Sequence, residues 1–108
     1  MRMDALRGPD AATLLIRALR THAAASGCPI HLVTVDSHGW ASATFTGMQH
    51  RVTIAADPVP GLRSWLDALP EAELELHGHI VADLAIDALG SIDGRTHISI
   101  AALTLINA

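Results

Sequence analysis

Histidines and carboxylates alternate with apolar residues over 73–89, and this stretch gives the sequence's first sign of chemistry. The even positions carry no charge, whereas the odd positions include Glu73, Glu75, His77, His79, Asp83 and Asp87. Successive side chains of a strand point to opposite faces, so the pattern predicts one long β-strand with an apolar and an ionisable face. Two histidines at i and i+2 can share a metal ion with a third ligand. His77 and His79 are therefore candidate metal ligands.

The next strand, expected over 95–107, shows how widely these groups are spread. Pairing Leu89 with Arg95 sets Asp87 beside His97, and Asp87 lies roughly 26 Å from His79 at ~3.3 Å per residue. Metal ligands must converge, so a polar sheet face with a cross-strand Asp87–His97 pair is favoured over a metal site. The sequence identifies no cofactor, and a divalent metal is the one group for which it offers ligands.

A second group of histidines emerges from the predicted strand registers. His31, Phe45 and His50 are expected in one row on the helix-facing side of a meander, and His22 lies on the apolar face of the first helix. Cys28, a further candidate metal ligand, follows that helix. His22, His31 and His50 are the candidate catalytic residues of a site between helix and sheet, because imidazoles can act as general acids and bases. The competing interpretation, which we favour, is that they are core-edge residues satisfied by backbone groups, with Cys28 a small buried hydrophobe.

Bulk composition narrows the class of protein. Half of the 108 residues are apolar, the net charge is −4, and all seven basic residues are arginines. Scattered arginines on an acidic chain argue against nucleic-acid binding. Lysine-free, alanine-rich usage suggests a bacterial source. One cysteine, no leader-like segment and no apolar run of membrane length predict a cytoplasmic protein without membrane contact.

Two helices are expected. Pro9 and Asp10 open the first, with Asp10 as a capping residue and Gly27 as a left-handed terminator. Its apolar residues fill one arc of the helical wheel. The second is short and lies over 62–69, before Pro70. Its apolar residues recur at i, i+3, i+4 and i+7, and they are Leu62, Trp65, Leu66 and Leu69.

Five strands are expected around these helices. Residues 30–36, 40–46 and the segment after Gly47-Met48 form a meander, with a loop at Ser37-His38-Gly39 and a turn at Gly47-Met48. The strands 73–89 and 95–107 form a final hairpin with a loop over 90–94. The order α-β-β-β-α-β-β predicts an α+β two-layer sandwich, a five-stranded antiparallel sheet with helices on one face. Residues 1–8 are expected to be a flexible lead-in and 9–108 a single domain.

The outer face of the last hairpin carries an apolar patch. Its expected members are Val81, Ala85, Leu103 and Leu105. Water disfavours such a patch, so we expect a second copy of the chain to cover it as a homo-oligomer, with a small-molecule ligand as a further partner. The sequence has no phosphate loop, Cys-x-x-Cys, His-Glu-x-x-His or Gly-x-Ser-x-Gly motif. It therefore favours a homo-oligomeric binding or assembly module. The alternative is a His-dependent enzyme or metal-binding protein with a site between helix and sheet.

Overall fold

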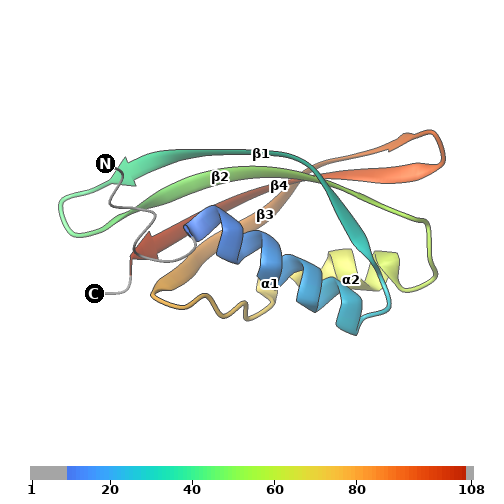
Figure 1. Ribbon diagram of the computed structural model, residues 1–108, viewed down its shortest axis with the longest axis horizontal. Helices are drawn as coiled ribbons and strands as arrows, with labels where there is room; N and C mark the ends of the chain where they lie inside the picture. Colours follow the sequence, from blue (N-terminus) through green and yellow to red (C-terminus); the bar gives the residue numbers. More distant parts are fainter. Residues whose placement is uncertain (1–9, 107–108) are drawn as a thin grey trace.

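The chain folds as an α+β unit with two α-helices and four antiparallel strands in the computed structural model, which describes residues 10–106 (Figure 1). In chain order the elements are α1 (Ala11–Ala25), β1 (Ile30–Ala41), β2 (Thr46–Ala56), α2 (Leu62–Ala68), the 3-10 turn η2 (Leu69–Glu71), β3 (His79–Ile92) and β4 (Arg95–Ile106). The expected lead-in over 1–8 lies outside the described residues.

Both helices form where the sequence predicts them, although α2 ends at Ala68 and Pro70 lies within η2 instead of following a helix that includes Leu69. The Asp10 carboxylate caps α1 by accepting a hydrogen bond from the Thr13 backbone N–H at 2.9 Å. Gly27 follows the helix with a φ of +74°, a conformation that glycine adopts without strain. The buried residues of α1 recur every fourth position, and they are Ala11, Leu15, Leu19 and Ala23. This spacing sets one stripe of the helix against the sheet.

The sheet has the order β1-β2-β4-β3, so β1 and β3 are its two edges. The prediction of five strands was wrong. The expected loop at 37–39 lies inside β1, and the expected turn at Gly47-Met48 lies inside β2. One long hairpin replaces the meander, and Ser42 closes it: its hydroxyl accepts hydrogen bonds from the N–H groups of Thr44 and Phe45.

Two glycines explain this error. Gly39 sits in the strand without a positive φ. Gly47 is required by a close approach of two backbones, because a Cβ there would collide with the carbonyl oxygen of Thr104 on β4. A glycine within an alternating pattern marks either a turn or such a close approach, and sequence alone does not distinguish them.

The final hairpin is confirmed, with shifted ends and register. β3 begins at His79 rather than at residue 73 and continues to Ile92, and Asp93 and Gly94 form the turn with φ values of 51° and 78°. Two residues with positive φ make the two-residue turn that suits the twist of a hairpin. Leu89 therefore pairs with Ile98 instead of Arg95.

Two irregularities in β3, between Val81 and Asp83 and between Ile86 and Ala88, interrupt its alternation. At a bulge one extra residue puts the side chains before it on the opposite alternation from those after it. Val81 consequently packs against the core, instead of joining the outer patch predicted for it. The expected pair of Asp87 with His97 is also absent, since Gly90 lies opposite His97 and Asp87 forms an ion pair with Arg51.

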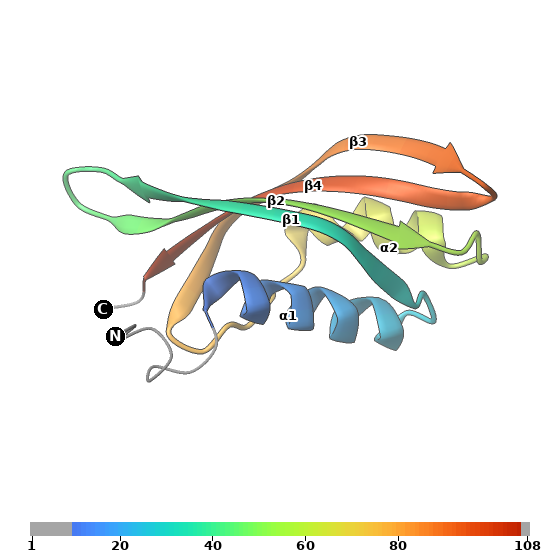
Figure 2. The same cartoon turned by 45° about the horizontal axis from the view of Figure 1, so that its top comes forward.

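Both helices lie on one face of the sheet, here called the helix face; the opposite face is the bare face (Figure 2). Leu15 and Leu19 of α1 and Trp65 of α2 pack with the inward residues of β2 and β4, which include Ile54, Ile98 and Ile100. The two hairpins extend past the helices, and Val35, Leu89 and Ile106 are left exposed. The helices thus cover part of the helix face, and the complete second layer expected from the sequence is not formed.

Candidate functional site

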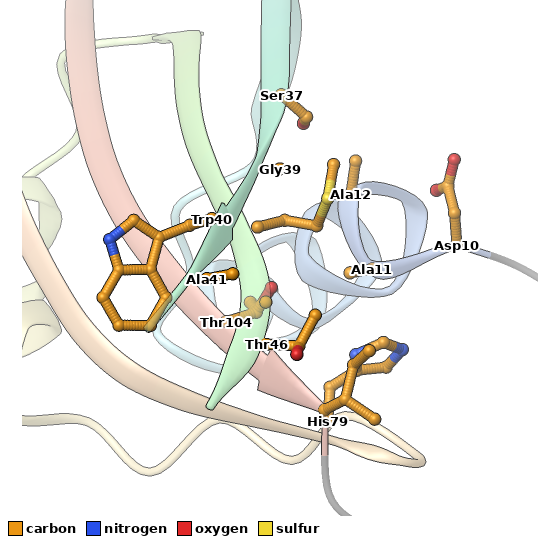
Figure 3. A pocket seen from close by; sticks show the side chains of 13 residues that line it. Asp10, Ala11, Ala12, Ser37, Gly39, Trp40, Ala41, Thr46, His79 and Thr104 are labelled. Atoms are coloured by element: carbon orange, nitrogen blue, oxygen red, sulfur yellow. The ribbon is translucent and has the colours of Figure 1, made fainter. Parts of the chain in front are cut away.

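A cavity of about 620 Å³ opens between the start of α1 and the far end of the β1–β2 hairpin (Figure 3). Small apolar side chains make up much of its wall, because α1 begins with Ala11 and Ala12. Asp10 and His79 lie on the same side of the cavity. The lining residues come from α1 and all four strands: Asp10, Ala11, Ala12, Ser37, Gly39, Trp40, Ala41, Thr46, Gly47, Met48, His79, Thr104 and Ile106.

A hydrogen-bonded chain of three polar side chains crosses the sheet beside the cavity. The Ser37 hydroxyl is 2.7 Å from Nδ1 of His50, and Nε2 of His50 is 2.8 Å from the Thr104 hydroxyl. His50 and Thr104 are the two buried polar residues of the described chain. Since buried polar groups are costly without partners, this chain satisfies both nitrogens of the imidazole.

Burial dominates the electrostatics of His50. Loss of water lowers the pKa of its imidazole below the ordinary 6.5, the negative charge of Asp10 acts in the opposite direction, and His79 and His38 lower it further. The imidazole is therefore neutral at neutral pH, so one of its nitrogens donates and the other accepts.

Asp10 brings a negative charge to the edge of the cavity. Hydrogen bonds from Thr13 lower the pKa of its carboxyl below the ordinary 3.8, more strongly than desolvation raises it. The carboxylate is ionised at neutral pH while it caps α1. The cavity thus combines apolar walls, one anion and the hydroxyl groups of Ser37 and Thr46.

The three candidate catalytic histidines lie in separate places. His50 is buried beside the cavity, whereas His22 lies near the end of α1 and accepts a 2.8 Å hydrogen bond from the indole N–H of Trp65. His31 is exposed and pairs with Ala55, on the bare face. Phe45, expected in one row with His31 and His50, is an exposed loop residue. The structure therefore brings one candidate of the three to the cavity.

The candidate metal ligands are also spread over the molecule. His79 lines the cavity, His77 is exposed in the turn before β3, and Cys28 is buried between α1 and β1, where its thiol donates to the Ser26 carbonyl oxygen. Within residues 10–106, no group of three or more His, Cys, Asp or Glu side chains is arranged to hold a metal ion.

The apolar patch on the bare face contains other residues than the interface patch that the sequence predicts. Ile80 lies beside Leu105 and is 50% exposed, so it takes the place of Val81. Together with Trp40 and Gly47 these two residues form one apolar row across all four strands. Ala85, Leu103 and the ion pair of Arg51 with Asp87 lie farther along the same face, which is more polar there.

Sequence reasoning did not identify four residues of the cavity as site residues, and they are Asp10, Ser37, Met48 and Thr104. The sequence predicts turns at Ser37 and Met48, whereas these residues lie in β1 and β2. Thr104 carried a usable signal, because it is the single hydroxyl between the inward-facing Ile98, Ile100, Ala102 and Ile106. A lone polar residue in such a set indicates a buried partner across the sheet.

No protein-family model matches the chain, and the search of curated proteins finds no match either. None of the helices in the described part of the chain is both long enough and apolar enough to span a membrane. The cavity and the exposed surfaces of the sheet are the features of the described chain that bear on function.

Proposed function

We propose that this protein is a non-catalytic binding module that takes a small apolar molecule in the cavity between α1 and the β1–β2 hairpin. The observation that carries the proposal is the cavity itself, about 620 Å³ with largely apolar walls and a few convergent polar groups. Sites for small molecules commonly have this size and composition.

The lining side chains define the chemistry of the ligand. An apolar surface for a ring or a branched chain is formed by Ala11, Ala12, Ala41 and Met48. At the rim the ionised Asp10 repels a carboxylate and attracts an amine. We therefore expect a ligand with an apolar body and one neutral or basic hydrogen-bonding group.

The alternative is an enzyme in which His50 activates Ser37, and the 2.7 Å contact between these side chains is the observation in its favour. A catalytic histidine, however, is usually oriented by a carboxylate that stabilises the imidazolium. His50 is instead held by the Thr104 hydroxyl, and its pKa is lowered by burial. Both features weaken it as a base, so the binding function is the better supported of the two.

Self-association and a cytoplasmic location are further parts of this proposal. The bare face and the two sheet edges support self-association, because no described helix covers them. A single buried cysteine supports a reducing compartment.

Fragment screening by NMR tests the proposal. Aromatic fragments, neutral or amine-bearing, should shift the amide signals of residues 10–12, 39–41 and 46–48 in the intact chain. Ala12→Phe should fill the cavity and weaken fragment binding at least tenfold, about 1.4 kcal/mol. Ala24→Phe, at an exposed position of the same helix, is the matched control and should bind like the parent. Shifts that cluster elsewhere, or equal affinities of the two variants, would reject the cavity as the site.

A further inference from the structure

Strand β1 presents a long edge that no described strand pairs with. Every residue from 31 to 39 is exposed, and these include Leu32, Val33 and Val35 at 37%, 46% and 37% exposure. The pairing of β1 with β2 is regular from Thr34 to Ala41, and this segment contains neither proline nor lysine. Such an edge carries unpaired backbone N–H and C=O groups ready to pair with another strand.

The register of β1 with β2 fixes which side chains share a face. Ser37 lies opposite the inward-facing His50, so Val35, Ser37 and Gly39 belong to the helix face. Residues of the bare face alternate with them, and they are Thr34, Asp36, His38 and Trp40. In an antiparallel pair, residues directly opposite each other must lie on the same face.

We propose that two copies of this chain pair through β1, antiparallel about a twofold axis at Ser37, and so form a continuous eight-stranded sheet. A twofold contact is self-complementary, so a pair of positions meets twice. In this register Asp36 of each copy lies opposite His38 of the other, which sets a carboxylate against an imidazole at both places. Centring the axis on Asp36 or on His38 would instead bring like side chains together.

The remaining pairs of this register are also compatible. Trp40 lies opposite Thr34 of the second copy on the bare face, and aromatic and β-branched residues are favourable cross-strand neighbours. On the helix face, Val35 of the second copy lies opposite Gly39, which lines the cavity. The two cavities would therefore flank the axis. The interface itself does not depend on whether either cavity binds a ligand.

A charge exchange tests both the interface and its register. Sedimentation velocity of the intact chain should show a dimer at concentrations up to about 100 μM, because association follows mass action. His38→Asp sets two carboxylates opposite each other twice and should raise the dimer dissociation constant roughly tenfold. The double variant Asp36→His/His38→Asp restores the opposite pairing and should return the constant to near the parent value.

Ala88→Asp is the matched control, since it adds the same charge to the other edge strand, β3, and should leave the dimer unchanged. Circular dichroism checks that each variant is folded, and amide exchange of residues 34–40 should slow as the protein concentration rises. A monomer at all concentrations would overturn the proposal. So would a dimer that is indifferent to His38→Asp, or a double variant that fails to recover.

Discussion

The two ends of the helix face are built from different side chains. At the core end, Leu19, Ile98 and Ile100 are fully buried beneath α1 and α2. At the cavity end, Ala12 and Ala41 are small, and Ile106 is 55% exposed. The sheet therefore belongs to a packed interior at the core end and forms one wall of the cavity at the cavity end. The difference shows that the later turns of α1 pack into the core, whereas its first turn borders the cavity.

The largest expected difference between the two ends is in packing energy. Leu19→Ala should lower the free energy of unfolding by about 2–5 kcal/mol, because it removes a fully buried side chain and leaves a void. Met48→Ala, beside the cavity, should cost less than about 2 kcal/mol since its surroundings are already open. Urea unfolding measures both, with the exposed Arg20→Ala as the control. Equal losses at the two ends would contradict the comparison.

The boundary between the two ends is the polar chain at His50. Thr104→Val keeps the shape of the side chain but leaves Nε2 of a buried imidazole without its partner, and should cost about 1–3 kcal/mol. Ser37→Ala should cost less than about 1 kcal/mol, because Ser37 is exposed and water can replace its hydroxyl. Urea unfolding of the two variants ranks them. A larger loss for Ser37→Ala would show that Ser37, rather than Thr104, is the main anchor of His50.

The smallest expected effect is a dependence on pH. The folded-state pKa of His50 lies below the ordinary 6.5, so the unfolded chain takes up a proton first as the pH falls. The free energy of unfolding should therefore be highest above pH 6.5 and decline toward the folded pKa, by no more than about 1.4 kcal/mol per pH unit. Asp10 acts in the same direction, but in the range below 3.8.

Urea unfolding between pH 7.5 and 5 measures this slope. His50→Gln should reduce it while the other six histidines stay in place. Identical slopes in the parent and the variant would show that His50 does not couple folding to protonation.

Local patterns predicted the helices well and the strands only in part. The Asp10 cap, the Gly27 terminator and the spacing of Leu62, Trp65 and Leu66 are all short-range signals, and the structure confirms them. Alternation also found the final hairpin. It failed for Val81, because the irregularity between Val81 and Asp83 has no short-range signal in this sequence and puts the residues before it out of step with those after it.

The candidate site was less predictable because its contacts are long-range. His50 and Thr104 are 54 residues apart and meet only because β2 lies next to β4. The prediction of five strands ended one strand at residue 46 and began the next after Gly47-Met48. It therefore did not place Thr46–Ala56 in a single strand next to β4. Gly47 was the nearest clue to the true arrangement, but its meaning depends on the carbonyl oxygen of Thr104 on the other strand.

The strand order has a consequence for how the chain reaches its fold. β1 with β2, and β3 with β4, are hairpins of neighbouring segments, and each can form with a short loop. The β2–β4 pairing is the one that joins distant parts of the described chain, and α2 lies in the connection that must close. Formation of the β2–β4 pairing therefore carries the largest cost in loop-closure entropy. We expect this step to set how strongly the topology of the sheet slows folding.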